Sequence, residues 1–276
     1  MSAKLSKVER HRQDLSGLFD EFLAGGDTSH LEEYILANSN LPGPRGNLEL
    51  AAAFGDVVQD LAGQPQVTER QWALCVGMAQ VPAGEAPVND PRELISFCGT
   101  IGVGALGSVS PGFCQPSLSI LRPLTRDPRW RMREAVCFAL QRLMVSHRQE
   151  TLAALEEWVS GGNLLEMRAA AATVAEPALL QDEVTANAAL ALHRQIIDQV
   201  CKVQDRKSEA FRVLRKALGY TLSLVVCALP EQGFALMARL LETQDPDLQW
   251  IVKENLKKNR LVKNYPEEVG ALQALL

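Results

Sequence analysis

A basic helical core recurs along the second half of the chain and sets the strongest limit on its fold. "WRMREAVCFAL" at 130–140 resembles "LEMRAAAATVA" at 165–175, "RVLRKALGYTL" at 212–222 and "WIVKENLKKNR" at 250–260. Aligning the copies places one basic residue of each in register at spacings of 35, 47 and 38 residues, namely Arg133, Arg168, Arg215 and Lys253. Such spacings are typical of two-helix repeats. One pair of helices cannot bury its own apolar face, so the pattern predicts stacked pairs.

The rest of the chain also favours helix. Aromatic residues make up only 5% of the sequence, alanine and leucine are abundant, and helical periodicity is interrupted only by short Pro, Gly and Asp breaks. No segment alternates strictly between apolar and polar residues as a half-buried strand does. The sequence therefore predicts an all-α fold of about twelve helices, with apolar residues at 47% and charged residues at 22% as in ordinary globular proteins.

Local signals place the ends of several helices. Amphipathic patterns predict helices over 5–24 and 28–37, after which "NSNLPGPRGN" forbids a continuous helix. Asn47 is suited to cap the next helix, and Thr68 to cap the one after it. A further helix is predicted to begin at Pro91, since proline is tolerated in the first turn.

Acidic residues accompany the repeated basic position. An acidic residue stands six positions before the basic residue in three of the four copies, namely Asp127, Glu209 and Asp247. The exception is the copy with Arg168, where Gly162 stands at that place. This arrangement resembles the HEAT-repeat family, clearly over 127–276 and loosely over 28–126. The resemblance implies a single repeat domain over 1–276, with divergent repeats in 1–126, wound as a right-handed α-α superhelix. It also implies a ladder of ion pairs linking successive repeats.

The ladder accounts for the basic residues in register but not for Arg129 and Arg131. If the inner helices line a concave face, basic and aromatic side chains on them are candidates for binding a macromolecule. The candidate groove residues are Arg129, Trp130, Arg131, Arg133, Arg168, Arg215, Trp250, Lys253, Lys257 and Arg260. A neutral or apolar trough would favour a protein or peptide, and a continuous positive channel would favour duplex DNA.

Part of the same pattern resembles the HEAT-like DNA-alkylation-repair glycosylases. Asp127, Trp130 and Arg133 follow that family's D-x-x-W-x-x-R arrangement, and a later basic residue with an arginine seven positions on is matched by Lys253 and Arg260. Ser96 stands where the family has its catalytic aspartate, so base excision lacks its carboxylate. We therefore predict no catalytic residue. The function expected first is a binding scaffold, and the alternative is a DNA-binding relative with altered or lost chemistry.

No other motif indicates catalysis, a metal or a cofactor. "GVGALG" at 102–107 matches G-x-G-x-x-G, but Pro111-Gly112 follows closely and no strand precedes it, so close helix packing explains the glycines better. The four histidines are far apart in sequence and are expected at surfaces or helix ends.

One loop has two interpretations. In "NLPGPRGN" the residues Arg45, Gly46 and Asn47 are suited to hold an anion at a helix N-terminus. A rigid connection in which Asn47 caps the next helix explains the same residues, and we favour it.

Cysteine usage and charge bear on the compartment and the partners. Six cysteines without any C-x-x-C pair indicate buried free thiols in a reducing cytoplasm. The N-terminal stretch has no apolar core typical of a signal peptide, and the most apolar segment, "LGYTLSLVVCALP", is too short to span a membrane. The net charge of −5 indicates no global attraction to nucleic acid, although a local basic face remains compatible with it.

Overall fold

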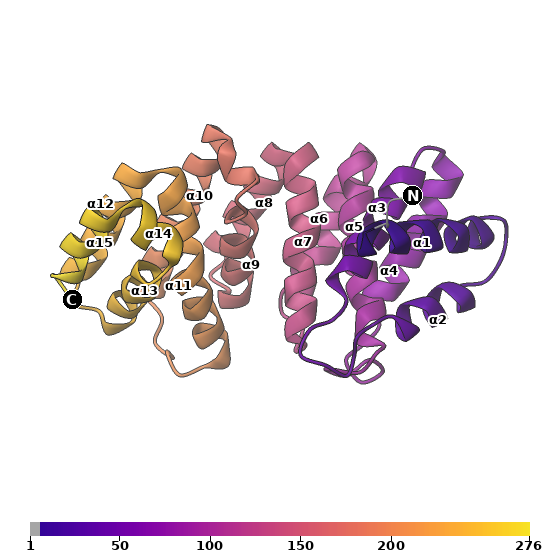
Figure 1. The fold of residues 1–276 in the computed structure, drawn as a ribbon, viewed down its shortest axis with the longest axis horizontal. Coiled ribbons are helices and arrows are strands. Elements are labelled where there is room, and N and C mark those ends of the chain that lie inside the picture. Colours follow the sequence, from indigo (N-terminus) through magenta and orange to yellow (C-terminus); the bar gives the residue numbers. More distant parts are fainter. Residues whose placement is uncertain (1–5) are drawn as a thin grey trace, which may run out of the picture. The chain divides into compact units, whose positions relative to one another are not determined.

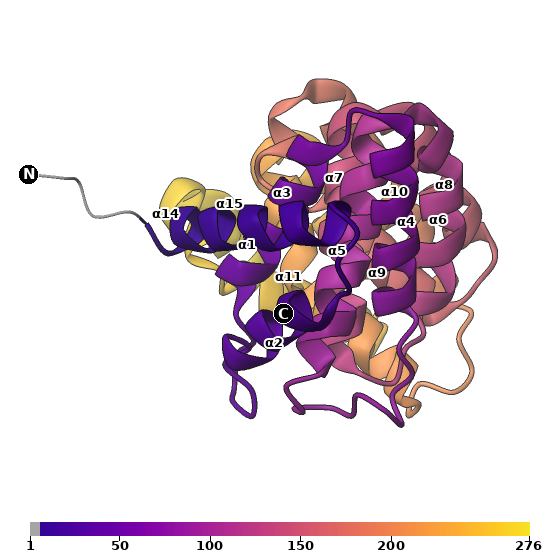
Figure 2. The same ribbon diagram turned by 90° about the vertical axis from the view of Figure 1, so that its right-hand side faces the viewer.

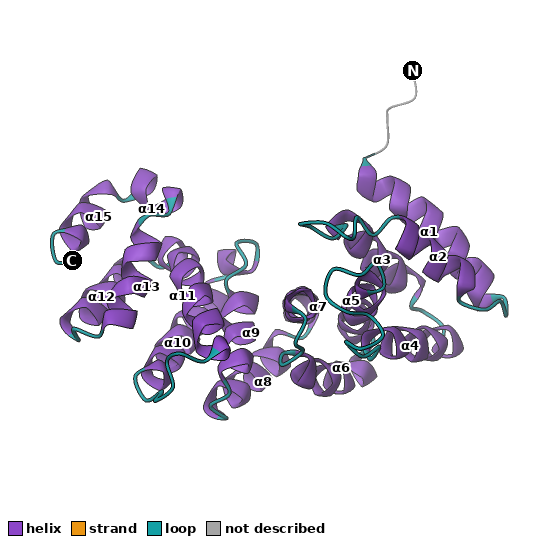
Figure 3. Cartoon of the chain, turned by 90° about the horizontal axis from the view of Figure 1, so that it is seen from below, coloured by secondary structure: helices purple, strands orange, loops and turns teal. Residues whose placement is uncertain are grey.

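The computed structural model describes residues 6–276 as an all-helical chain. These residues form fifteen α-helices and one short 3₁₀ helix, and they contain no strand (Figure 3). The count exceeds the predicted twelve, partly because the C-terminal region breaks into two short helices. Residues 1–5 lie outside the described part, and with them the first residue of the helix predicted over 5–24 and the start of the N-terminal stretch examined for a signal. No helix in 6–276 is long and apolar enough to cross a bilayer.

The chain divides into two compact units, residues 1–151 and 152–276. This division does not coincide with the change in repeat pattern near residue 126, and the single repeat domain predicted for 1–276 remains a prediction. The first unit contains α1 (Lys7–Leu23), α2 (Ser29–Ala37), α3 (Leu48–Leu61), α4 (Pro65–Ala79), α5 (Glu93–Val109), α6 (Pro111–Leu124) and α7 (Trp130–Ser146). Helix α8 (Arg148–Ser160) runs across the boundary.

Helices of the first unit pack in two layers. Helices α3, α5 and α7 lie side by side in one layer, while α4 and α6 cover α5 from the other (Figures 1 and 3). Helix α1 packs on α3 and lies across the direction of α4 (Figure 2). Because α5 has neighbours on every side, its residues Glu93–Ser108 are all buried.

Small residues allow α5 to lie this close to its neighbours. A Cβ added at Gly104 would stand 2.5 Å from the Cα of Ala139 in α7, and one at Gly102 would stand 2.4 Å from the sulfur of Cys75 in α4. The G-x-G-x-x-G sequence lies inside this helix, and α5 ends at Val109 before Pro111 begins α6. The glycines therefore serve helix packing, as the sequence indicated.

The predicted helix ends were partly right. Asn47 caps α3 by accepting a hydrogen bond from the backbone N–H of Leu50 at 3.0 Å. Thr68 lies inside α4, which begins at Pro65, and its hydroxyl donates to the carbonyl of Gln64. The proline at the first turn started that helix earlier than the cap signal suggested. Helix α5 begins at Glu93, two residues after the predicted start.

The second unit repeats the two-layer pattern. It contains α9 (Leu164–Val174), the 3₁₀ helix η1 (Leu179–Gln181), α10 (Glu183–Val200), α11 (Glu209–Ala228), α12 (Pro230–Glu242), α13 (Pro246–Leu256), α14 (Asn259–Asn264) and α15 (Pro266–Gln273). Helices α9, α11 and α13 lie in one layer, with α10 packed on α9 and α12 packed on α11 and α13 (Figure 3).

Polar contacts fix the position of α13 against α11. Arg215 forms an ion pair with Asp247, the acidic residue that stands six positions before Lys253. The side chain of Asn255, which is fully buried, donates to the carbonyl of Leu218 at 2.8 Å and accepts from the backbone N–H of Ser223 at 2.7 Å. The Arg215–Asp247 pair is a contact of the kind that the predicted ladder would contain, and the ladder itself remains a prediction.

Candidate binding pocket in the first unit

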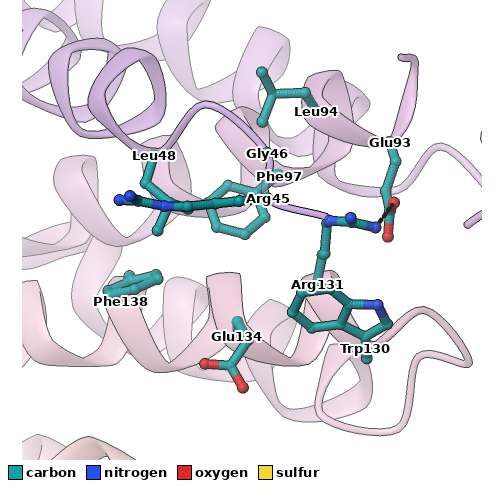
Figure 4. Close-up of a pocket in the computed structure, with 10 residues that line it drawn as sticks. All are labelled: Arg45, Gly46, Leu48, Glu93, Leu94, Phe97, Trp130, Arg131, Glu134 and Phe138. Carbon is teal, nitrogen blue, oxygen red and sulfur yellow. Dashed lines mark hydrogen bonds and ion pairs between the residues drawn. The ribbon is translucent and has the colours of Figure 1, made fainter. Parts of the chain in front are cut away.

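A pocket opens between α5 and α7 in the first unit, below the loop that leads into α3. Trp130, Glu134 and Phe138 stand four residues apart in α7, which places them on one face of that helix. The opposite wall comes from α5 and from the start of α3 (Figure 4). The pocket has a volume of about 250 Å³ and is lined by Arg45, Gly46, Leu48, Glu93, Leu94, Phe97, Trp130, Arg131, Glu134 and Phe138.

Three of the ten residues that line the pocket are aromatic, namely Phe97, Trp130 and Phe138. The rings of Phe97 and Phe138 have centroids 6.2 Å apart. Trp130 is 45% exposed and Phe138 is 37% exposed, so both present a face to solvent, whereas Phe97 is buried. Apolar groups of this size are normally covered, and partly exposed ones beside a cavity are typical of a binding site.

A buried ion pair closes one end of the pocket. The Nη1 atom of Arg131 donates to Oε2 of Glu93 at 3.0 Å, and Nη2 donates to the backbone carbonyl of Gly43 at 2.8 Å. The same Glu93 oxygen also accepts from the backbone N–H of Asn89 at 2.8 Å. The Arg131 guanidinium lies 4.5 Å from the centroid of the Trp130 ring, which suits a cation–π contact.

Two polar atoms of this ion pair have no partner among the described residues. They are Oε1 of Glu93 and Nε of Arg131, and both are buried. Glu93 is fully buried and Arg131 is 5% exposed. An unpaired buried donor or acceptor is unfavourable, so these two atoms reduce the stability that the ion pair contributes to the fold.

Arg129, a predicted groove residue, lies in the interior instead. It is 1% exposed, and all five N–H donors of its guanidinium are used. They bind both carboxylate oxygens of Asp127, the carbonyls of Ala86 and Val81, and the hydroxyl of Ser96. Arg129 therefore ties the start of α7 to α5 and to the loop before it, and it offers no surface to a phosphate.

The other arginines of this segment are also held within the protein. Arg133 is buried and donates to the backbone carbonyls of Asp127 and Pro128. Arg142 donates to the carboxylate of Asp56 at 2.8 Å, which links α7 to α3. Positive charge that the sequence placed near a groove is thus largely used to join helices.

The loop with two interpretations serves mainly as a connection. Asn47 caps α3, and Arg45 lies within ion-pair distance of Glu49 at 3.6 Å. Gly46 is buried against Leu94. Arg45 and Gly46 also form part of the pocket wall, so the loop contributes to a site of a different character from the anion site considered for it.

In the second unit the predicted residues differ in burial and in the rings they contact. Arg168 is buried, and the Arg215 guanidinium lies 4.3 Å from the centroid of the half-buried Trp250 ring. Tyr220 is 47% exposed, with Arg260 at 4.7 Å and Lys258 at 5.7 Å from its ring centroid.

The second unit also has lysines that are exposed to solvent. Lys253 and Lys257 are exposed, and Lys257 forms an ion pair with Glu254. These residues belong to what we name the lysine-rich segment, residues 253–263, which has five basic residues and one acidic one.

No histidine or cysteine lines the pocket between α5 and α7. His193, expected at a surface or helix end, is fully buried in α10 and hydrogen-bonded to Thr221, and burial lowers its pKa to about 4. Four of the six cysteines are buried as predicted, whereas Cys201 is exposed and Cys227 is half-buried. Burial raises the pKa of the Cys75 thiol, which makes it a poor nucleophile.

Sequence reasoning did not single out Glu93, Phe97 or Phe138. The four-residue spacing of Trp130, Glu134 and Phe138 was a signal for a shared helix face. The pairing of Glu93 with Arg131 joins residues 38 positions apart, which no local pattern reveals.

Comparisons with known proteins give little to add to this geometry. No family model matches the chain, and no curated protein matches it. Among solved structures it is similar to the crystal structure of an engineered protein from the Northeast Structural Genomics Consortium, with 12% sequence identity and a TM-score of 0.30, over 86% of this chain and 97% of that one. At this similarity the comparison assigns neither a fold family nor a function to the chain.

Proposed function

We propose that the protein is a non-catalytic helical-repeat scaffold that binds a polypeptide segment at the pocket between α5 and α7. One observation carries the proposal, namely a mostly apolar pocket in which Trp130 and Phe138 expose aromatic surface. Large aromatic groups around a small cavity are the usual anchors of protein recognition. The pocket's volume of about 250 Å³ suits one inserted side chain better than a large cofactor.

The proposal includes HEAT-like repeats wound as a right-handed superhelix. Its support is the same two-layer packing inside each unit and the Arg215–Asp247 rung between neighbouring repeats. We also propose a cytoplasmic location, supported by six free cysteines, since reduced thiols persist in that compartment.

A peptide-display selection on the purified protein tests this function. We expect enrichment of related sequences that bind the wild type, and at least a tenfold loss of affinity in Trp130→Ala because one wall of the pocket is removed. Tyr220→Ala is the matched control, since it removes an exposed aromatic ring of the second unit. Failure to enrich any sequence, or equal binding by Trp130→Ala, would reject the proposal.

Duplex DNA is the second candidate partner, as expected of a relative of the alkylation-repair glycosylases with altered or lost chemistry. The lysine-rich segment favours it, since its exposed lysines, together with the half-buried Lys258 beside the ring of Tyr220, suit phosphates with an aromatic contact. The burial of Arg129, Arg131 and Arg133 weakens it, because these arginines are not available to phosphates.

Titration of duplex DNA at several salt concentrations separates the two candidates. Binding through lysines weakens steeply as salt rises, whereas insertion of an apolar side chain depends weakly on salt. Release of alkylated purines from the duplex would overturn the non-catalytic assignment altogether.

A further inference from the structure

A chain of hydrogen bonds joins α1, α2 and the start of α3 in the first unit. Tyr34 of α2 donates its hydroxyl proton to Oδ2 of Asp14 in α1 at 2.8 Å. The Tyr34 oxygen also lies 2.8 Å from Nδ1 of His11, and Nε2 of His11 lies 3.3 Å from Nδ2 of Asn47. The residues on both sides of Asn47 line the pocket between α5 and α7, so the chain ends at the loop that roofs this pocket.

The proton positions along this chain follow from its first donor. Burial raises the pKa of Tyr34, and the hydrogen bond to Asp14 raises it further, so the hydroxyl keeps its single proton. That proton goes to the Asp14 carboxylate, and the Tyr34 oxygen therefore accepts from Nδ1–H of His11. A neutral imidazole carries one proton, so Nε2 of His11 is left as an acceptor.

Asn47 presents the matching donor in a fixed orientation. Its Oδ1 atom accepts from the backbone N–H of Leu50 at 3.0 Å, and its Nδ2 atom donates to the carbonyl of Asn38 at 2.8 Å. Turning the amide over would break both bonds, so the second N–H of Nδ2 is the one that reaches Nε2 of His11. The backbone N–H of Asn47 also donates to the carbonyl of Ser39 at 3.0 Å, which closes the loop before α3.

The surroundings of His11 keep its ring neutral at pH 7. Burial has the largest influence and lowers the pKa of His11 from its ordinary value of 6.5. Arg10 and Lys7 of α1 lower this pKa as well, whereas Asp14 of α1 and Glu49 of α3 raise it. These four residues are the charged ones that line the polar cavity around His11, and burial together with the two cations outweighs the two carboxylates.

Protonation of His11 turns the acceptor of this chain into a donor. Nε2 then carries a proton that points at the N–H of Asn47, so two donors face each other. Asn47 cannot offer an acceptor there without giving up its bonds to Leu50 and Asn38. Opening of the loop returns His11 to its ordinary environment, so opening becomes more favourable as the pH falls below about 6.5.

We infer that protonation of His11 loosens the loop that roofs the pocket between α5 and α7, so that the pocket binds its ligand more weakly below about pH 6.5. The inference rests on the proposed function, because it specifies how binding at that pocket responds to pH. Arg131 holds the same loop at the carbonyl of Gly43, so the loosening is partial and centres on Asn47.

Hydrogen exchange of the full chain at pH 7.5 and pH 5.5 tests the inference. The backbone amides of Asn47 and Leu50 report on it, since both donate within the loop and its cap. After correction for the intrinsic rate, we expect their protection to fall roughly threefold to tenfold at pH 5.5, as loss of one hydrogen bond predicts. Amides of α13 in the second unit should keep their protection. Unchanged protection at Asn47 and Leu50 would overturn the inference.

Two variants identify His11 as the titrating group. His11→Gln can place an amide oxygen near the position of Nε2, so it still accepts from Asn47 but does not titrate, and protection should be equal at the two pH values. Asn47→Asp still caps α3 but sets a carboxylate against Nε2, so it should raise the pKa of His11 and reverse the pH dependence. NMR titration of the His11 ring measures this shift. An unchanged pKa in Asn47→Asp, or a pH dependence that persists in His11→Gln, would contradict the inference.

Toluene connects the loop to binding, because it is a neutral probe whose size suits an apolar pocket of about 250 Å³. By ligand-observed NMR, its affinity for the wild type should fall roughly threefold between pH 7.5 and pH 5.5. Its affinity for His11→Gln should stay constant. Equal affinity of the wild type at both pH values, or no toluene binding at pH 7.5, would overturn the link between His11 and the pocket.

The outcome is distinguishable from that of the proposed function. A peptide selection that enriches no sequence would reject the scaffold and leave the pH-dependent loop standing. Selected peptides that bind equally well at both pH values, with constant protection of Asn47 and Leu50, would overturn the pH-dependent loop and leave the scaffold standing.

Discussion

Two basic segments of similar sequence character have opposite structural roles. The arginine-rich segment, residues 122–148, contains seven arginines, and the lysine-rich segment, residues 253–263, contains four lysines and one arginine. In the first, Arg129, Arg131 and Arg133 are buried and bound to carboxylates or backbone carbonyls. In the second, Lys253 and Lys257 are exposed.

The difference follows from the chemistry of the two side chains. A guanidinium has five donors in a planar arrangement, so it can satisfy several buried acceptors at once, as Arg129 does. An ammonium group is strongly hydrated and stays in solvent. The density of positive charge along a sequence therefore does not indicate positive surface unless the kind of cation and its possible partners are considered.

The largest effect that tests this comparison is expected at Arg129. Arg129→Met should lower the free energy of unfolding by about 3–5 kcal/mol, because it removes the cation paired with the Asp127 carboxylate and leaves the carbonyls of Ala86 and Val81 without this donor. Urea denaturation followed by circular dichroism measures it. Lys257→Met is the matched control in the other segment and should change stability by less than about 0.5 kcal/mol. Similar losses for both variants would break the distinction.

The close packing of α5 and α7 that encloses the arginines gives the next effect. Gly104→Ala should cost about 1–3 kcal/mol, since its Cβ would stand 2.5 Å from Ala139. Gly77→Ala in α4 is the control, because nothing lies within 4 Å of its added Cβ and it should gain about 0.5–1 kcal/mol. Thermal unfolding of the two variants should shift in opposite directions.

A partly buried arginine of the second unit should show an intermediate, pH-dependent effect. Arg206 donates to Asp245 at 2.8 Å and lowers the pKa of that carboxyl below its ordinary value. Stability from this pair is present above the unfolded pKa of about 4 and is lost as pH falls through the lower folded pKa.

Asp245→Asn isolates this charge, since asparagine still caps α13. It should lower stability by about 0.5–1 kcal/mol at pH 7 and by much less at pH 2, as measured by urea denaturation at both pH values. An equal loss at the two pH values would exclude the ion pair as the cause.

The smallest effect on stability, and the sharpest test of the exposed lysines, comes from Lys253→Ala. We expect the free energy of unfolding to change by no more than about 0.5 kcal/mol. If duplex DNA binds at all, the slope of log affinity against log salt should fall by about one for each phosphate contact removed. An unchanged slope would show that the lysine-rich segment does not contact the phosphates.

The fold was more predictable from sequence than the pocket was. Helical periodicity and the repeated basic position are local patterns, and they indicated the all-helical architecture and the Arg215–Asp247 contact. The sequence predicted that Thr68 caps the start of α4, and this was wrong because Pro65 begins the helix one turn earlier. The pocket depends on contacts between distant residues such as Glu93 and Arg131, and on which side of α7 remains uncovered. Those are properties of tertiary packing that no short window of sequence contains.

The hydrogen bond from Arg131 to the carbonyl of Gly43 has a consequence for how a ligand enters the pocket. It joins the connection before α3, which forms the roof of the pocket, to α7, which forms the floor of the pocket. Roof and floor are thus held together before any guest arrives. The pocket is therefore formed before a ligand binds, and little binding free energy is lost to ordering its walls. We expect rapid association, and we expect ligands to differ in affinity mainly through their dissociation rates.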